Sequence, residues 1–126
     1  MKVTSKAIEN KIIINSVVGE VNFDKIAEYI SENIESWISK PVIWDMSKAD
    51  LSTVPSDQLR SFLQKMQSLS KKKSGEKTAI VAPQDMEYGM MRMFEIFAEN
   101  ESFEMELRVF RTIEEAKQWL PENNKI

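Results

Sequence analysis

The stretch KIIINSVVGEVNFDKIAEYISENIESWISKPVIW, residues 11–44, decides the fold. It opens with an apolar, β-branched run, which predicts a buried strand over residues 11–18. Apolar residues then recur at helical spacing over residues 23–38, with charged residues between them, so this segment predicts an amphipathic helix. A second short apolar run follows at residues 42–44, and we expect it to end at Asp45 as a central strand. A strand, a helix and a strand in this order favour a βαβ crossover.

Working outward, the flanking sequence supplies the remaining elements of an α/β fold. A weaker strand near residues 3–8 precedes a turn at Glu9-Asn10. Thr112 and Glu115 form the capping box of a last helix, which Pro121 ends. We therefore expect one domain over residues 1–126, with a mixed five-stranded sheet and four helices. The other expected elements are a helix that starts at Ser56, a basic loop, a buried strand, a methionine-rich helix and a strand, over residues 56–69, 70–75, 78–82, 86–98 and 106–111.

The composition excludes most familiar enzyme chemistry. The 126 residues contain no cysteine and no histidine, which removes thiol nucleophiles, disulfides, the usual zinc ligands and Ser-His pairs. Seventeen Lys plus Arg against twenty Asp plus Glu leave a formal charge of −3, so we expect no nucleic-acid partner. No apolar run is long enough for a signal peptide or a transmembrane segment, so we expect a cytoplasmic protein. We expect no cofactor and no bound metal.

Four blocks of sequence carry a family resemblance that covers nearly the whole chain. They are VVGEV at 17–21, VIWD at 42–45, AIVAP with YGMMRMFE at 79–95, and VFRTIEEAKQWL at 109–120. Together they resemble the STAS domain, in its bacterial anti-sigma-factor-antagonist-like (STAS/SEC14-like) branch. The resemblance implies an α/β scaffold that acts as a binding or regulatory module and is not an enzyme. The SEC14-like part of the name implies a lipid or another hydrophobic small molecule as an alternative ligand.

The start of the second helix departs from the family's phosphorylation motif. In phosphorylatable STAS regulators this helix opens with Asp-Ser-Ser-Gly, and the second serine accepts phosphate from a kinase. Here the equivalent residues are Pro55, Ser56, Asp57 and Gln58, so an aspartate stands at the acceptor position and the glycine is missing. We expect any phosphate-linked switch to be locked or absent. Ser56 and Asp57 are candidates for a regulatory helix start, with helix capping as the alternative.

Asp45 and Asp85 are candidates for a ligand site. Each is expected just past the carboxyl end of a parallel strand, where open α/β sheets bind ligands. Two such carboxylates could hold Mg²⁺, as in a phosphoacceptor or an enzyme. The alternative is that each aspartate accepts hydrogen bonds from nearby backbone amides.

The methionine-rich helix has two faces at 100° per residue. The first is predicted to be the core face, and the second, solvent-facing one is a candidate contact surface because Tyr, Met and Arg are enriched at protein interfaces. The alternative for the second face is a local pair of Tyr88 with Arg92. The predicted core face consists of Met86, Met90, Met93, Phe94, Ile96 and Phe97, and the predicted outer face of Tyr88, Met91, Arg92 and Glu95.

Lys71, Lys72 and Lys73 form the only biased segment of the sequence. A run of lysines could contact anionic lipid headgroups. The preferred interpretation is a solvated loop, because no aromatic residues are interleaved with the lysines. The sequence as a whole thus predicts a non-enzymatic module with a protein partner or a second copy, with a carrier of a hydrophobic ligand as the first alternative and a Mg²⁺-dependent phosphoacceptor or enzyme as the second.

Overall fold

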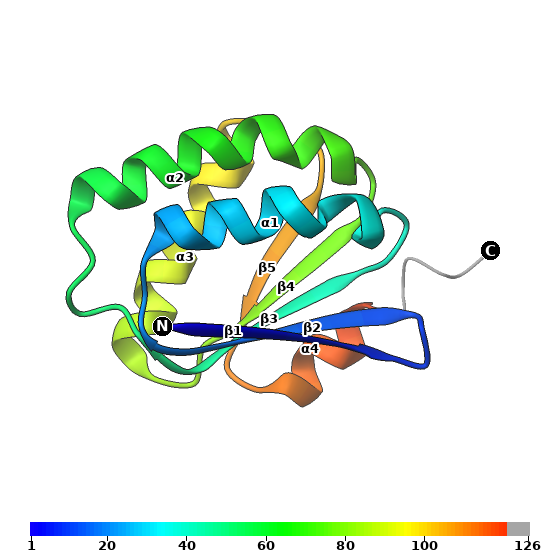
Figure 1. Cartoon of the computed structure of the whole chain (residues 1–126), viewed down its shortest axis with the longest axis horizontal. Helices are drawn as coiled ribbons and strands as arrows, with labels where there is room; N and C mark the ends of the chain where they lie inside the picture. The colour runs from blue at the N-terminus through cyan, green and yellow to red at the C-terminus, as the bar shows by residue number, and fades with distance from the viewer. Residues whose placement is uncertain (121–126) are drawn as a thin grey trace.

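The computed structural model describes residues 1–120 and contains a five-stranded sheet with four α-helices (Figure 1). The strands lie in the order β1-β2-β3-β4-β5, with β1 antiparallel to β2 and the other neighbours parallel. This arrangement confirms the predicted mixed sheet. The elements are β1 (Lys2–Ile8), β2 (Ile12–Glu20), α1 (Phe23–Trp37), β3 (Val42–Asp50), α2 (Ser56–Leu69), the 3₁₀ turn η1 (Ser70–Lys73), β4 (Lys77–Val81), α3 (Asp85–Asn100), β5 (Glu106–Phe110) and α4 (Ile113–Trp119).

A tight hairpin starts the sheet. Glu9 and Asn10 both have positive φ, 52° and 57°, and the Lys11 backbone N–H donates to the Ile8 carbonyl at 2.9 Å, so residues 8–11 form a β-turn within a three-residue connection. The register then pairs Ile8 with Ile12 and continues to Lys2 with Val18. The predicted turn is confirmed, and β1 covers the outer edge of β2.

Two apolar clusters hold the helices on opposite faces of the sheet. Helices α1, α2 and α3 cover one face, where Phe62 packs on Phe94 with ring centroids 5.6 Å apart and Trp37 on Trp44 at 6.1 Å. Helix α4 covers the other face with Ala116 and Leu120. The capping box of α4 is present, since Thr112 and Glu115 bond each other's backbone amides. Helix α4 ends at Trp119, and the stop predicted at Pro121 lies outside the described residues.

Strand β3 is longer than its apolar run predicts. The expected end at Asp45 is wrong, because the strand continues to Asp50. Its polar half pairs with β2 beyond a bulge, with Gly19 opposite Ala49. Met46 and Ala49 are buried, and the backbone pairing with β2 keeps this half in the sheet without a continuous apolar sequence.

The orientation of α3 is the main correction to the sequence prediction. Met91 is 2% exposed and lies in the core, and Glu95 is also buried, although both were predicted to face solvent. Conversely, Met93 is 64% exposed, and Met86 and Ile96 are about half exposed, although all three were predicted to be core residues. The predicted core face is thus divided: Phe94 is buried, Met90 and Phe97 are half-buried, and the other three residues face outward.

Backbone hydrogen bonds explain why the arc with two glutamates faces the sheet. The Glu87 carboxylate accepts from the Leu51 backbone N–H at 3.2 Å, and the Glu95 carboxylate accepts from the Val109 N–H at 3.3 Å. A buried carboxylate costs much less when it is hydrogen-bonded, and each of these two accepts from a backbone amide in β5 or directly after β3. A prediction from the spacing of apolar residues takes no account of such hydrogen bonds.

The lysine triplet is not a solvated loop along its whole length. Residues 70–73 form the η1 turn, in which Lys73 is 4% exposed. The Lys73 Nζ donates to the backbone carbonyls of Trp37 and Lys40, each at 2.5 Å, and so ties down the end of α1. Burial lowers the pKa of Lys73 to about 8, although the Glu76 charge acts in the opposite direction. Only Lys71 and Lys72 of the triplet are exposed.

Candidate partner-binding surface at the strand ends

The carboxyl ends of β3, β4 and β5 lie at the same edge of the sheet because these strands are parallel. The segments that follow them begin helices α2, α3 and α4. Two of the predicted candidate residues, Asp85 and Tyr88, stand there in the first turns of α3, whereas Ser56 and Asp57 open α2, whose start lies apart from that of α3 (Figure 1). We call Asp85 and Tyr88, together with Arg111 after β5, the strand-end surface.

Arg111 contacts both other residues of this surface. Its Nη1 donates to the Asp85 Oδ1 at 2.7 Å and to the Pro83 carbonyl at 3.0 Å. Its guanidinium carbon also lies 4.0 Å from the centroid of the Tyr88 ring, a cation–π geometry. Asp85 and Arg111 remain exposed, so the ion pair contributes little to stability. Sequence reasoning did not assign Arg111 to the site, although its position directly after the last strand was a signal.

The other candidate residues of α3 have different partners from those predicted. Arg92 Nη1 contacts both carboxylate oxygens of Glu95 at 2.9 Å, so the pair predicted between Tyr88 and Arg92 is replaced by two separate pairs. Tyr88 is half-buried and Arg92 is exposed. Met91 cannot contribute to a contact surface, since its side chain is packed in the core.

The start of α2 presents Ser56 and Asp57 to solvent. Pro55 stands at the N-cap position, and the described residues form no side-chain cap hydrogen bond there, so the capping role expected of Ser56 and Asp57 is absent. Asp57 lies in the first turn, where a negative charge interacts favourably with the helix dipole. The exposed hydroxyl and carboxylate therefore stand beside first-turn amides that have no side-chain acceptor.

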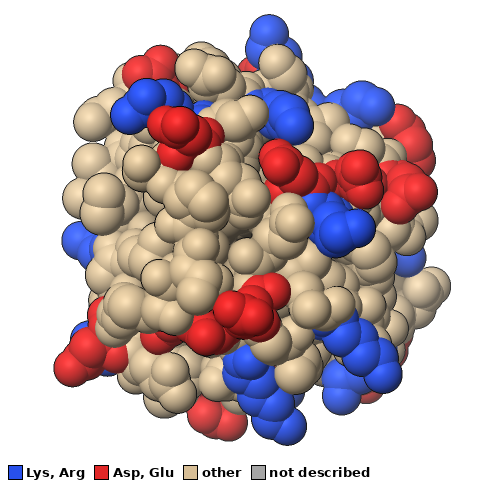
Figure 2. All heavy atoms as spheres, turned by 60° about the vertical axis from the view of Figure 1, so that its left-hand side comes forward, with Lys and Arg blue, Asp and Glu red and all other residues tan. Residues whose placement is uncertain are grey.

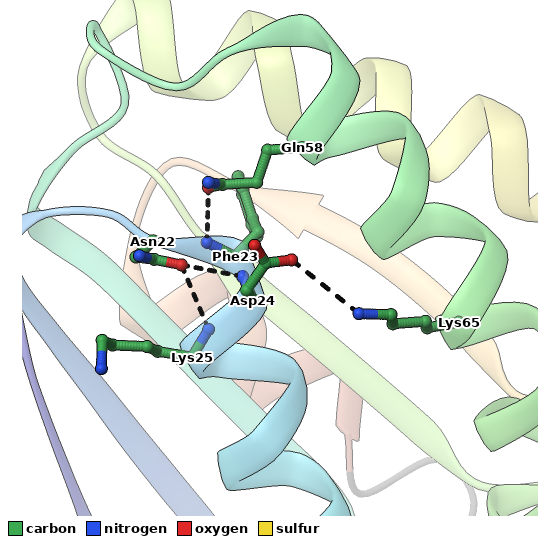
Figure 3. Close-up of polar contacts among 6 residues, drawn as sticks. All are labelled: Asn22, Phe23, Asp24, Lys25, Gln58 and Lys65. Atoms are coloured by element: carbon green, nitrogen blue, oxygen red, sulfur yellow. Dashed lines mark hydrogen bonds and ion pairs between the residues drawn. The ribbon is translucent and has the colours of Figure 1, made fainter.

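Hydrogen bonds at the start of α1 fix the position of α2 (Figure 3). The Asn22 Oδ1 accepts from the backbone amides of Asp24 and Lys25 at 3.0 and 3.2 Å, which confirms the predicted cap. The remaining amide, that of Phe23, donates to the Gln58 Oε1 of α2 at 2.8 Å. A residue from the second helix thus completes the cap of the first, and this bond anchors the start of α2 to the start of α1.

The connection between β3 and α2 is held by two carboxylates. Glu87, from α3, binds the Leu51 amide, and the Asp50 Oδ1 accepts from the Ser52 amide at 2.9 Å and from its hydroxyl at 2.6 Å. The hydrogen bonds from the Ser52 side chain and backbone hold the pKa of Asp50 below its ordinary value. Sequence reasoning assigned no role to Glu87.

Asp45 and Asp85 do not form a common site. Asp45 lies inside β3 on the same face as Ile43, toward α4, and its Oδ1 accepts from the Ser47 amide at 3.0 Å. This is the local backbone bond given as the alternative. Asp85 opens α3, on the opposite face, and pairs with Arg111. Residues 1–120 contain no group of three or more acidic side chains that could hold a metal ion.

Two small apolar cavities lie between the sheet and the helices. Their volumes are about 40 and 60 Å³, and Trp44 and Met66 line both. A dry cavity that binds benzene measures about 150 Å³, so neither has room for an acyl chain. Within residues 1–120, no helix is both long and apolar enough to cross a bilayer.

Comparisons with known proteins identify the scaffold. No family model and no curated protein sequence matches the chain. Among solved structures, the anti-sigma factor antagonist SpoIIAA in its unphosphorylated form matches with a TM-score of 0.51 and 14% identity, over 93% of this chain and 96% of that one. The chain has the STAS fold. The Bacillus cell fate determinant SpoIIAA in its phosphorylated form also has this fold and matches with a TM-score of 0.50 and 14% identity, over 93% and 97% of the two chains.

Proposed function

We propose that this protein is a non-enzymatic regulatory module of the cytoplasm that binds a protein partner through the strand-end surface. The observation that carries the proposal is the group of exposed Arg111 and Asp85 with half-buried Tyr88, at the carboxyl ends of β4 and β5 on a STAS fold. SpoIIAA, which has the same fold, is by its title an anti-sigma factor antagonist. That role supports a regulatory use of the scaffold.

The strand-end surface has the chemistry of a recognition site. Tyrosine and arginine are enriched among the residues that contribute most to protein interfaces. Arg111 is held in place by the Pro83 carbonyl and the Tyr88 ring, so little side-chain entropy is lost when a partner binds. Since the Arg111–Asp85 pair is exposed, a partner carboxylate can share the guanidinium without breaking a structural bond.

The start of α2 supports regulation without a phosphate switch at the acceptor position. The negative charge of Asp57 does not depend on a kinase, whereas a serine at the same position would gain negative charge when it is phosphorylated. We therefore propose that partner binding here does not depend on phosphorylation at residue 57. The neighbouring Ser56 hydroxyl is exposed. Phosphoproteomics that found Ser56 modified stoichiometrically in cells, with altered partner binding, would overturn this part of the proposal.

Site-specific photo-crosslinking in the source cells tests the proposed surface. A photoreactive phenylalanine analogue replaces Tyr88 in one variant and Lys11, an exposed residue of the β1–β2 hairpin, in the control. We expect a discrete crosslinked protein from position 88 and none from position 11, and Arg111→Ala should reduce the yield from position 88 severalfold. Equal crosslinking from both positions, or a yield that Arg111→Ala leaves unchanged, would contradict the proposal.

A further inference from the structure

The outward arc of α3 is an apolar surface with no partner among the described residues. Met93 is 64% exposed, Ile96 47% and Met86 46%, and all three lie on one side of a single helix. Single exposed apolar residues are ordinary, but three on one arc over about three turns form a patch. Figure 2 brings forward the side of the molecule where α2 and α3 begin, and shows a broad area there with few charged side chains. We call Met86, Gly89, Met93 and Ile96 the α3 outer arc.

Gly89 indicates what kind of partner would cover this arc. It lies inside α3 and is exposed, and a Cβ added to it would meet no atom within 4 Å. A glycine within a helix costs about 1 kcal/mol relative to alanine. Neither its conformation nor the packing of the described residues requires a glycine. A second backbone that approaches α3 closely at this point would require one, since small residues allow helix axes to come together.

The charges beside the arc are complementary to those of a second, antiparallel α3. Asp85 and Arg92 lie along one edge of the arc, four residues before and three residues after Gly89. If two α3 helices cross antiparallel at Gly89, Asp85 of each copy lies opposite Arg92 of the other, and Met86 lies opposite Met93. The helix dipoles also oppose each other in this arrangement. A parallel pair would place like charges together.

We propose that the α3 outer arc binds a second copy of this chain in a symmetric antiparallel helix pair, with the two Gly89 residues at the crossing point. Arg92 also binds Glu95, and Asp85 also binds Arg111, but each group retains capacity for one more contact. The three apolar side chains expose roughly 300 Å² per copy, well below the approximately 800 Å² of a standard interface. The dimer should therefore be weak and depend on protein concentration.

Sedimentation velocity over a range of concentrations, with thermal melting at the lowest one, tests the dimer. Met93→Glu should raise the dimer dissociation constant at least tenfold and leave the monomer's melting temperature unchanged, because the side chain is exposed in the monomer. Gly89→Ala should weaken association while raising the melting temperature, a pair of changes that a purely structural role of the glycine would not produce. A parent that stays monomeric at all concentrations, or dimers that Met93→Glu leaves intact, would overturn the proposal.

Disulfide trapping gives a geometric test, because the chain contains no cysteine. We expect Gly89→Cys to oxidise to a covalent dimer, since crossing at this residue brings the two Cα atoms within disulfide range. Lys11→Cys, on the hairpin, is the matched control and should remain monomeric. Equal trapping of the two variants would refute the crossing point. If the protein proves monomeric while crosslinking from position 88 persists, the proposed dimer is refuted and the proposed function stands.

Discussion

Two methionines on α3, Met91 and Met93, should differ sharply in their contribution to stability. Met91→Ala removes a side chain that is 2% exposed and lines the larger apolar cavity between the sheet and the helices. The lost transfer free energy of its atoms beyond Cβ is about 2 kcal/mol, and the enlarged cavity adds on the order of 1 kcal/mol. We expect a total loss of about 3 kcal/mol in the free energy of unfolding, which corresponds to a fall of roughly 10 °C in melting temperature.

Met93→Ala is the matched control, because it makes the same chemical change two residues away at a side chain that is 64% exposed. It should change the free energy of unfolding by less than about 0.5 kcal/mol. Urea denaturation of both variants, at two protein concentrations to separate any effect of self-association, gives the comparison. A loss for Met93→Ala that equals or exceeds the loss for Met91→Ala would show that the helix is oriented as its periodicity predicts, and would refute the placement of the α3 outer arc.

Three further predictions concern charged groups, two of them buried. The pKa of Lys73 is about 8 in the folded protein and 10.5 ordinarily, so between these pH values the unfolded chain binds more protons than the folded one. In urea denaturation, the free energy of unfolding of the parent relative to Lys73→Met should therefore rise from pH 8 to pH 10.5. A difference that does not change with pH would refute the burial of the amine. Glu87→Ala leaves the Leu51 amide without its acceptor and should lower the free energy of unfolding, measured by urea denaturation, by about 2 kcal/mol. Glu99→Ala, at an exposed site, is the control and should lower it by less than about 0.5 kcal/mol. The double change of the exposed lysines 71 and 72 to glutamine should leave the melting temperature within about 3 °C of the parent, and a larger fall would mean that η1 depends on them.

Local signals predicted elements whose determinants lie within a few residues of each other. The turn at Glu9-Asn10, the cap of α1 at Asn22 and the capping box at Thr112 are all present in the structure. Each depends on hydrogen bonds or dihedral angles inside a short segment, so it forms independently of the rest of the fold. The STAS resemblance was likewise confirmed at the level of the fold.

Predictions failed where a distant residue supplies the missing partner. Strand β3 extends past Asp45 because β2 pairs with its polar half, and Lys73 is buried because backbone carbonyls at and just after the end of α1 accept hydrogen bonds from its amine. The strand-end surface was found only in part for the same reason. Asp85 and Tyr88 were visible as candidates, but Arg111, which lies against both, comes from a different part of the chain.

The sequence by itself determined the order of strands and helices and the α/β class, since hydrophobic periodicity and capping residues are local properties. The tertiary structure alone decided which arc of α3 meets the sheet. Both arcs are apolar enough to be buried, and the choice depends on where Glu87 and Glu95 find backbone donors, at Leu51 and Val109. Leu51 directly follows β3 and Val109 lies in β5, both outside the helix, so no periodicity within residues 85–100 predicts which arc is buried.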